Sequence, residues 1–119
     1  MKIFSIINAI GAFNKLTSAD MPIPDAYKLQ KLTAALQTDI AFFNEQNEKI
    51  IKKHGGEIQG NGTVRYPEEN TSAAQAEFEE LISFETQTEI QKITIKASEN
   101  INISVKDITA LEPFVEFII

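Results

Sequence analysis

Cysteine and tryptophan are absent from this chain of 119 residues, and histidine occurs once, at His54. The lack of cysteine excludes disulfides, thiolate nucleophiles and thiolate metal sites, and it suits a reducing compartment. A single histidine leaves little material for zinc catalysis or for a Ser-His-Asp triad. We therefore expect that the protein is not an enzyme, uses no cofactor and binds no metal.

Long apolar runs are also missing. The first residues, "MKIFSIINAIGAFNKL", superficially resemble a signal peptide, but Asn8 interrupts the run and it is too short to span a bilayer. Their apolar residues recur at spacings of three and four, which predicts an amphipathic helix over residues 1–16. We expect a cytoplasmic protein with no membrane association.

Glycine is scarce, and the only glycine-rich stretch is "HGGEIQGNGTVRYPEEN", His54 to Asn70. A phosphate-binding loop would need a strand before it, a helix directly after it and usually a lysine in the turn. Here a helical pattern precedes the glycines and strand-like residues follow them. We therefore predict a β-hairpin over residues 57–66, with Gly60, Asn61 and Gly62 supplying positive φ angles.

Negative charge dominates the second half of the chain. Residues 1–54 carry seven basic and five acidic groups, whereas residues 55–119 carry four basic and twelve acidic groups. This balance argues against nucleic-acid binding, because neutralising phosphates needs a basic stripe. The acidic half is either a solvated face or a surface that meets a basic protein or mimics nucleic acid.

The remaining pattern predicts one domain of the α+β class. After the linker "TSADMPIP", helical spacing continues over residues 24–54, where two lysines and His54 precede the terminating Gly55 and Gly56. A capping box of Ser72 with Gln75 predicts an acidic helix over residues 71–83, antiparallel to the first.

In residues 88–119 the helical spacing of apolar residues gives way to other patterns. Alternation at residues 93–97 and 101–103 predicts short strands, a second capping box of Ser104 with Asp107 predicts a short helix, and the terminal "FVEFII" is prone to form a strand. We therefore expect long antiparallel helices joined by a β-hairpin, followed by a small antiparallel sheet that contains a short C-terminal helix.

Four segments between Asn44 and Phe117 stand out, namely "NEQNEKIIKKHGG", "VRYPEEN", "FEELISFETQTEI" and "ISVKDITALEPFVEF". Together they resemble a family of small, uncharacterised tailed-bacteriophage and prophage proteins of unknown function, and the resemblance covers most of the chain from about Asp25 onward. The shared features are the basic turn Lys52–Gly55, the Glu-Leu-Ile of the acidic helix and the terminal Leu-Glu-Pro-Phe. The resemblance implies a phage or prophage origin, in the host cytoplasm or the virion, and it transfers no catalytic residue.

Three functions follow as hypotheses. The first is a non-enzymatic interaction protein that binds a host or phage protein partner and could inhibit host machinery such as immunity. The second is a virion structural or assembly factor, and the third is a protein that sequesters a small nucleotide. The long apolar stripe also favours self-association, with a homodimer expected unless residues 3–16 cover the same stripe within one chain.

Particular residues are assigned to these hypotheses. For partner binding, the candidates are Phe42, Glu77, Glu79 and Glu80, because Phe42 lies on a different helix face from the core residue Phe43. For a nucleotide, the only clustered basic candidates are Lys52, Lys53 and Arg65.

Overall fold

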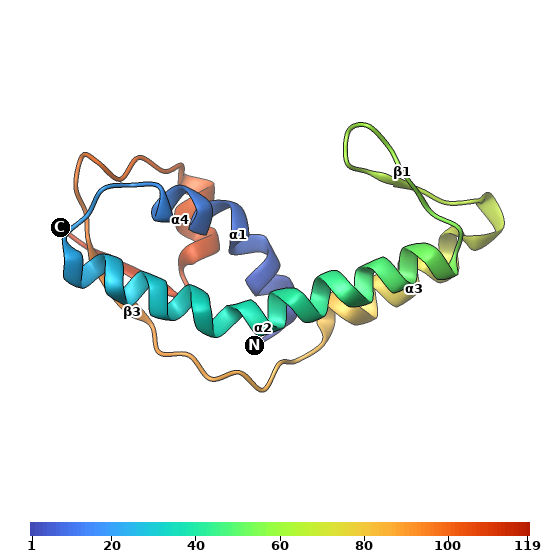
Figure 1. Cartoon of the computed structure of the whole chain (residues 1–119), viewed down its shortest axis with the longest axis horizontal. Coiled ribbons are helices and arrows are strands. Elements are labelled where there is room, and N and C mark those ends of the chain that lie inside the picture. The colour runs from blue at the N-terminus through green and yellow to red at the C-terminus, as the bar shows by residue number, and fades with distance from the viewer.

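The computed structural model describes residues 1–119 and contains four helices and two small two-stranded sheets. The helix α2, Ile23–Lys53, runs along most of the molecule, and the other elements pack along it in two groups (Figure 1). The first group, with the first half of α2, is the body, and it contains α1 (Ile3–Thr17), β3 (Ile93–Lys96), α4 (Val105–Leu111) and β4 (Val115–Ile118). The second group is the arm, residues 41–84, and it contains the second half of α2 with β1 (Glu57–Ile58), β2 (Val64–Arg65) and α3 (Glu68–Ser83). The predicted α+β class is confirmed.

The body holds the main hydrophobic core. The amphipathic pattern of α1 does form a helix, and it buries Ile6, Phe13 and Leu16 against the α2 residues Leu29 and Leu36. Residues of β3, α4 and β4 close this core from the other side, and the ring of Phe114 meets that of Phe13 edge-on at 5.3 Å between centroids. Eleven of the twelve buried residues belong to these five elements, and Phe114 lies in the turn between α4 and β4, so residues 6–36 and 95–115 meet in one core.

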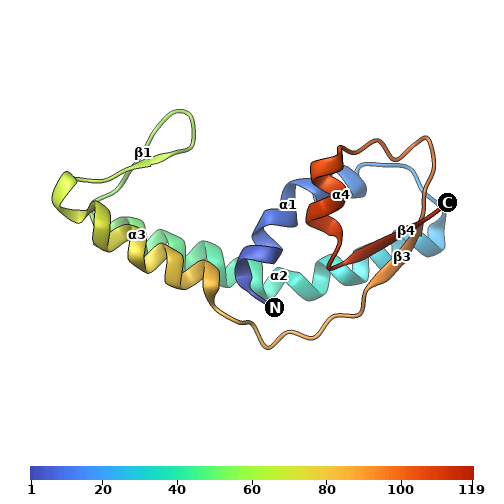
Figure 2. The ribbon, with the colours of Figure 1, turned by 180° about the vertical axis from the view of Figure 1, so that it is seen from behind.

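The second sheet is a correction to the sequence prediction. We predicted an antiparallel sheet, but β3 and β4 pair in parallel, with Ile93 opposite Val115 and Ile95 opposite Phe117 (Figure 2). The cause is the helix α4, which lies between the two strands in the chain and carries it back so that β4 starts beside the start of β3. On the edge of β3 that does not pair with β4, the Lys96 N–H donates to the carboxylate of Asp25 in α2 at 3.2 Å.

The strand predicted at residues 101–103 does not form. Ile101 and Ile103 have no strand partner, and both are half-buried against the body core in the connection that leads to α4. Their alternation therefore reflects two side chains that pack inward from an irregular loop. Residues 84–92 are also irregular, apart from an isolated bridge between Glu85 and Lys2, and they run back along α2 from the arm to β3 (Figure 1).

The predicted hairpin is present at the tip of the arm, with Glu57 opposite Arg65 and Ile58 opposite Val64. Gly55 adopts a φ of 67° directly after α2, as expected for a helix-terminating glycine. In the hairpin turn only Gly62 has a positive φ, so the same expectation for Gly60 and Asn61 was wrong. The Asn61 side chain instead accepts hydrogen bonds from the Thr63 N–H and hydroxyl, which shapes the turn without a left-handed residue.

The acidic helix starts earlier than predicted. The α3 helix begins at Glu68, with Pro67 as its N-cap, and Ser72 lies inside the helix without a capping hydrogen bond. Pro67 fixes an extended entry, and Glu68 and Glu69 then stabilise the first turn by their charge. The capping box at Ser104 and Asp107 forms as predicted.

The molecule is longer than its mass requires. Its radius of gyration is 16.7 Å, whereas a compact domain of this length has about 13.5 Å. Its accessible surface is 8150 Å², against about 6500 Å² for a compact monomer of this mass. The arm explains both values, because its two helices enclose only a small core that Phe43 and Leu81 share with Ile3 of α1.

Candidate functional site

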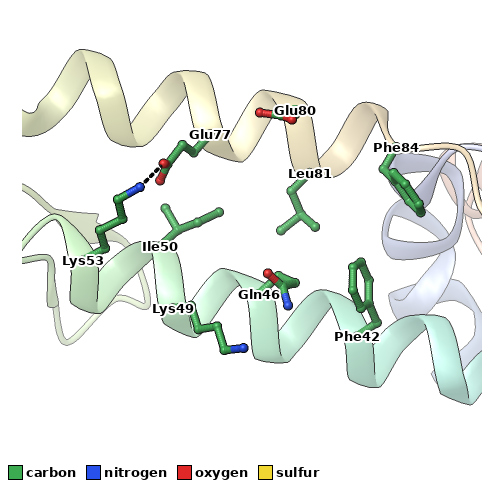
Figure 3. A pocket seen from close by; sticks show the side chains of 9 residues that line it. All are labelled: Phe42, Gln46, Lys49, Ile50, Lys53, Glu77, Glu80, Leu81 and Phe84. Carbon is green, nitrogen blue, oxygen red and sulfur yellow. Dashed lines mark hydrogen bonds and ion pairs between the residues drawn. The ribbon is translucent and has the colours of Figure 1, made fainter.

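A groove of about 350 Å³ lies on the arm between α2 and α3 (Figure 3). Apolar side chains form its floor and one end, and charged or amide side chains form its rims. The α2 helix contributes Phe42, Gln46, Lys49, Ile50 and Lys53, while α3 and its C-cap contribute Glu77, Glu80, Leu81 and Phe84. The groove follows from the arm having two helices only, because no third element covers the seam between them.

Two aromatic rings form the apolar end of the groove. The rings of Phe42 and Phe84 face each other at 6.0 Å between centroids, although 40% and 53% of these residues remain exposed (Figure 3). Neighbouring residues of a helix point about 100° apart, so the burial of Phe43 against Phe78 leaves Phe42 on the groove side. An exposed aromatic pair over an apolar floor is the kind of surface that protein interfaces bury.

A hydrogen-bonded cluster forms the other end. The Lys53 ammonium donates to Glu77 Oε1 at 2.6 Å, and the His54 Nε2 atom lies 2.7 Å from Glu77 Oε2. These partners, Lys53 first and His54 second, hold the pKa of Glu77 below its ordinary value. The buried His54 is fixed further, since the Asn70 amide donates to its carbonyl and the Tyr66 ring lies edge-on to it.

Of the charged side chains between these two ends, one has a partner of opposite charge within the chain and one has none. Lys49 is paired with Glu45 on its own helix at 3.4 Å. The carboxylate of Glu80 forms no hydrogen bond and no ion pair within the chain, and it is exposed on the α3 rim. The groove therefore presents one free negative charge beside its apolar floor.

The four predicted partner-binding residues do not all lie together. The structure brings Phe42, Glu77 and Glu80 into the groove, whereas Glu79 points elsewhere and accepts from the Gln75 amide at 3.4 Å. The Glu77 carboxylate is not free to meet a partner, because Lys53 and His54 at the end of α2 already contact both of its oxygens. Sequence reasoning missed Phe84, for which the available signal was an aromatic residue directly after the apolar stripe of α3.

The three basic residues proposed to bind a nucleotide also do not form one site. Lys52 pairs with Glu48 at 2.9 Å and Lys53 pairs with Glu77, so carboxylates already neutralise both. Arg65 is exposed on β2 at the tip of the arm and forms no ion pair. Of the three, only Lys53 lines the groove.

No family model, curated protein or solved structure matches this chain. The resemblance to phage and prophage proteins thus stays a prediction from the sequence segments quoted above. None of the four helices combines the length and the hydrophobicity that crossing a bilayer requires.

Proposed function

We propose that the protein is a non-enzymatic, phage-encoded interaction protein that binds a host or phage protein through the groove in its arm. One observation carries the proposal: Phe42 and Phe84 form an exposed aromatic pair at the end of an apolar floor that no part of the chain covers. Large aromatic side chains in such positions supply most of the binding energy of protein interfaces. The proposed setting, the cytoplasm of a bacterial host, rests on the sequence resemblance.

The surface area supports a contact of this kind. The chain exposes about 1700 Å² more than a compact monomer of its mass. A standard protein interface removes about 800 Å² from each partner, so the arm has enough surface for one. The thin core of the arm also means that a partner would add buried apolar contacts where the chain alone has few.

A photo-crosslinking experiment tests the proposal. A benzophenone amino acid replaces Gln46, which lines the groove, in a chain expressed in host cells that carry the phage or prophage. We expect an adduct with a second protein, and we expect Phe42→Ala to reduce its yield because the aromatic anchor is lost.

The same photoreactive group at Gln75, which is on α3 but outside the groove, is the matched control. Tyr27→Ala controls for the loss of an exposed aromatic residue elsewhere on α2. A Gln46 probe that gives no adduct, or one whose adduct is as abundant in the Phe42→Ala chain as in the wild type, would contradict the proposal.

A further inference from the structure

The charges around the groove restrict what can occupy it. Resting on the proposed function, we infer that the partner segment is an amphipathic α-helix whose apolar stripe is flanked by lysine or arginine on the side that faces α3.

The length and walls of the groove suit a helix. It extends along α2 from Phe42 to Lys53, twelve residues whose ends lie about 16 Å apart, which is three helical turns. Both walls are helices whose backbone groups are already hydrogen-bonded, so the groove offers no strand edge to an extended peptide. A third helix laid between α2 and α3 would instead bury its stripe on Ile50 and Leu81, with Phe42 and Phe84 at one end.

The electrostatics favour a basic helix. The arm carries eight glutamates and four basic residues, a net charge of −4, and α3 itself has five glutamates and no lysine or arginine. Every lysine of the arm is already paired, Lys49 with Glu45, Lys52 with Glu48 and Lys53 with Glu77. A cation on the incoming helix would thus meet the free carboxylate of Glu80, whereas an anion would meet no free cation in the groove.

The same charges disfavour a second copy of this chain as the occupant. Two arms that each carry a net charge of −4 repel, and their lysines are engaged within each copy. The homodimer predicted from the sequence is therefore the competing occupant in the test.

Fluorescence anisotropy with three labelled probe peptides of about 14 residues tests the inference. The basic probe has a leucine stripe flanked by lysines, the acidic probe has glutamates in place of the lysines, and the third probe has the basic composition with its stripe scrambled. We expect the full-length protein to bind the basic probe at least roughly tenfold more tightly than either of the others.

A charge reversal locates the contact. In Glu80→Lys, affinity for the basic probe should fall roughly three- to tenfold, and affinity for the acidic probe should rise. Glu79→Lys changes the net charge equally but lies outside the groove, so its effect should be much smaller. Circular dichroism melts check that both variants fold.

Three results would overturn the inference: equal or tighter binding of the acidic probe, equal effects of Glu80→Lys and Glu79→Lys, or a wild-type dimer that Phe42→Ala dissociates in sedimentation equilibrium. If the probes fail while the Gln46 crosslink still yields a second protein, the helix inference is wrong and the proposed function stands. If both experiments fail, both proposals are wrong.

Discussion

His54 illustrates how one residue can have a role that its position in the sequence does not show. Its place at the end of α2 suits a cation near the negative end of the helix dipole. The structure buries the ring and places it against Glu77 of α3, with Lys53 on the other carboxylate oxygen. A helix end is thereby joined to a neighbouring helix, and the tip of the arm is held by a carboxylate with two partners.

This cluster predicts that the thermal stability of the protein falls as the pH is lowered. The pKa of Glu77 is lowered in the folded chain, chiefly by the Lys53 hydrogen bond, so its stabilising effect is present above its ordinary pKa of 4.5. That effect is lost as the pH falls through the lowered folded-state pKa. We expect the thermal midpoint of the wild type to fall more than that of Glu77→Gln between about pH 6 and about pH 3, measured by circular dichroism. Parallel declines in both proteins would show that Glu77 is not responsible.

Two glycines predict opposite effects of the same substitution. A Cβ atom at Gly56 would lie 2.7 Å from the Tyr66 ring and 2.8 Å from Val64, whereas a Cβ atom at Gly11 would meet nothing within 4 Å. We expect Gly56→Ala to destabilise the protein by about 1–3 kcal/mol through overpacking at the base of the hairpin. Gly11→Ala should stabilise it by about 0.5–1 kcal/mol, because alanine favours the interior of α1. Urea unfolding measures both free energies. A destabilised Gly11→Ala variant would contradict the finding that a Cβ atom at Gly11 has open space around it.

At the scale of single elements, the two capping boxes in the sequence had different outcomes. Ser104 and Asp107 form the box and start α4, whereas Ser72 lies inside α3 because Pro67 and Glu68 start that helix earlier. Local sequence offered both positions as helix starts. The choice at α3 was made by proline, which fixes an extended backbone where the hairpin ends.

This difference is measurable. Ser104→Ala should cost about 1 kcal/mol of unfolding free energy, because it removes the side-chain acceptor for the Asp107 N–H. Ser72→Ala should leave stability unchanged or raise it by about 0.5 kcal/mol, since alanine has the higher helix propensity. Denaturant unfolding of the two variants compares them directly, and a loss at Ser72 equal to that at Ser104 would show that α3 uses the box.

At the scale of the whole molecule, the body and the arm differ in how much core they share. Twelve buried residues hold the body, and three hold the junction with the arm. Regions with few buried apolar contacts open at lower free energy than the core of the same protein. The arm thus has both the exposed groove and the lower expected local stability.

Hydrogen exchange tests this contrast. Amides in α3 should exchange at least roughly tenfold faster than amides in α1 and β3, because opening the arm disrupts the smaller core. A bound basic probe peptide should slow exchange in α3 and in the second half of α2, and leave α1 unchanged. Uniform protection across the chain would contradict the division into body and arm.

The sequence by itself determined the elements whose cause is local. The apolar spacing of α1 and α2, the glycine end of α2, the hairpin and the Ser104 box all depend on neighbours within a few residues, and each formed. Periodicity also separated the buried Phe43 from the exposed Phe42.

Only the tertiary structure decided which distant elements meet. The parallel pairing of β3 and β4, the bonding of Glu77 to Lys53 and His54, and the meeting of Phe84 with Phe42 all join residues far apart in the chain. Such contacts depend on how the helices pack and where the connections lead, and the local spacing of residues predicts neither. The groove belongs to this second group, because it exists only where α2 and α3 lie side by side without a third element to cover them.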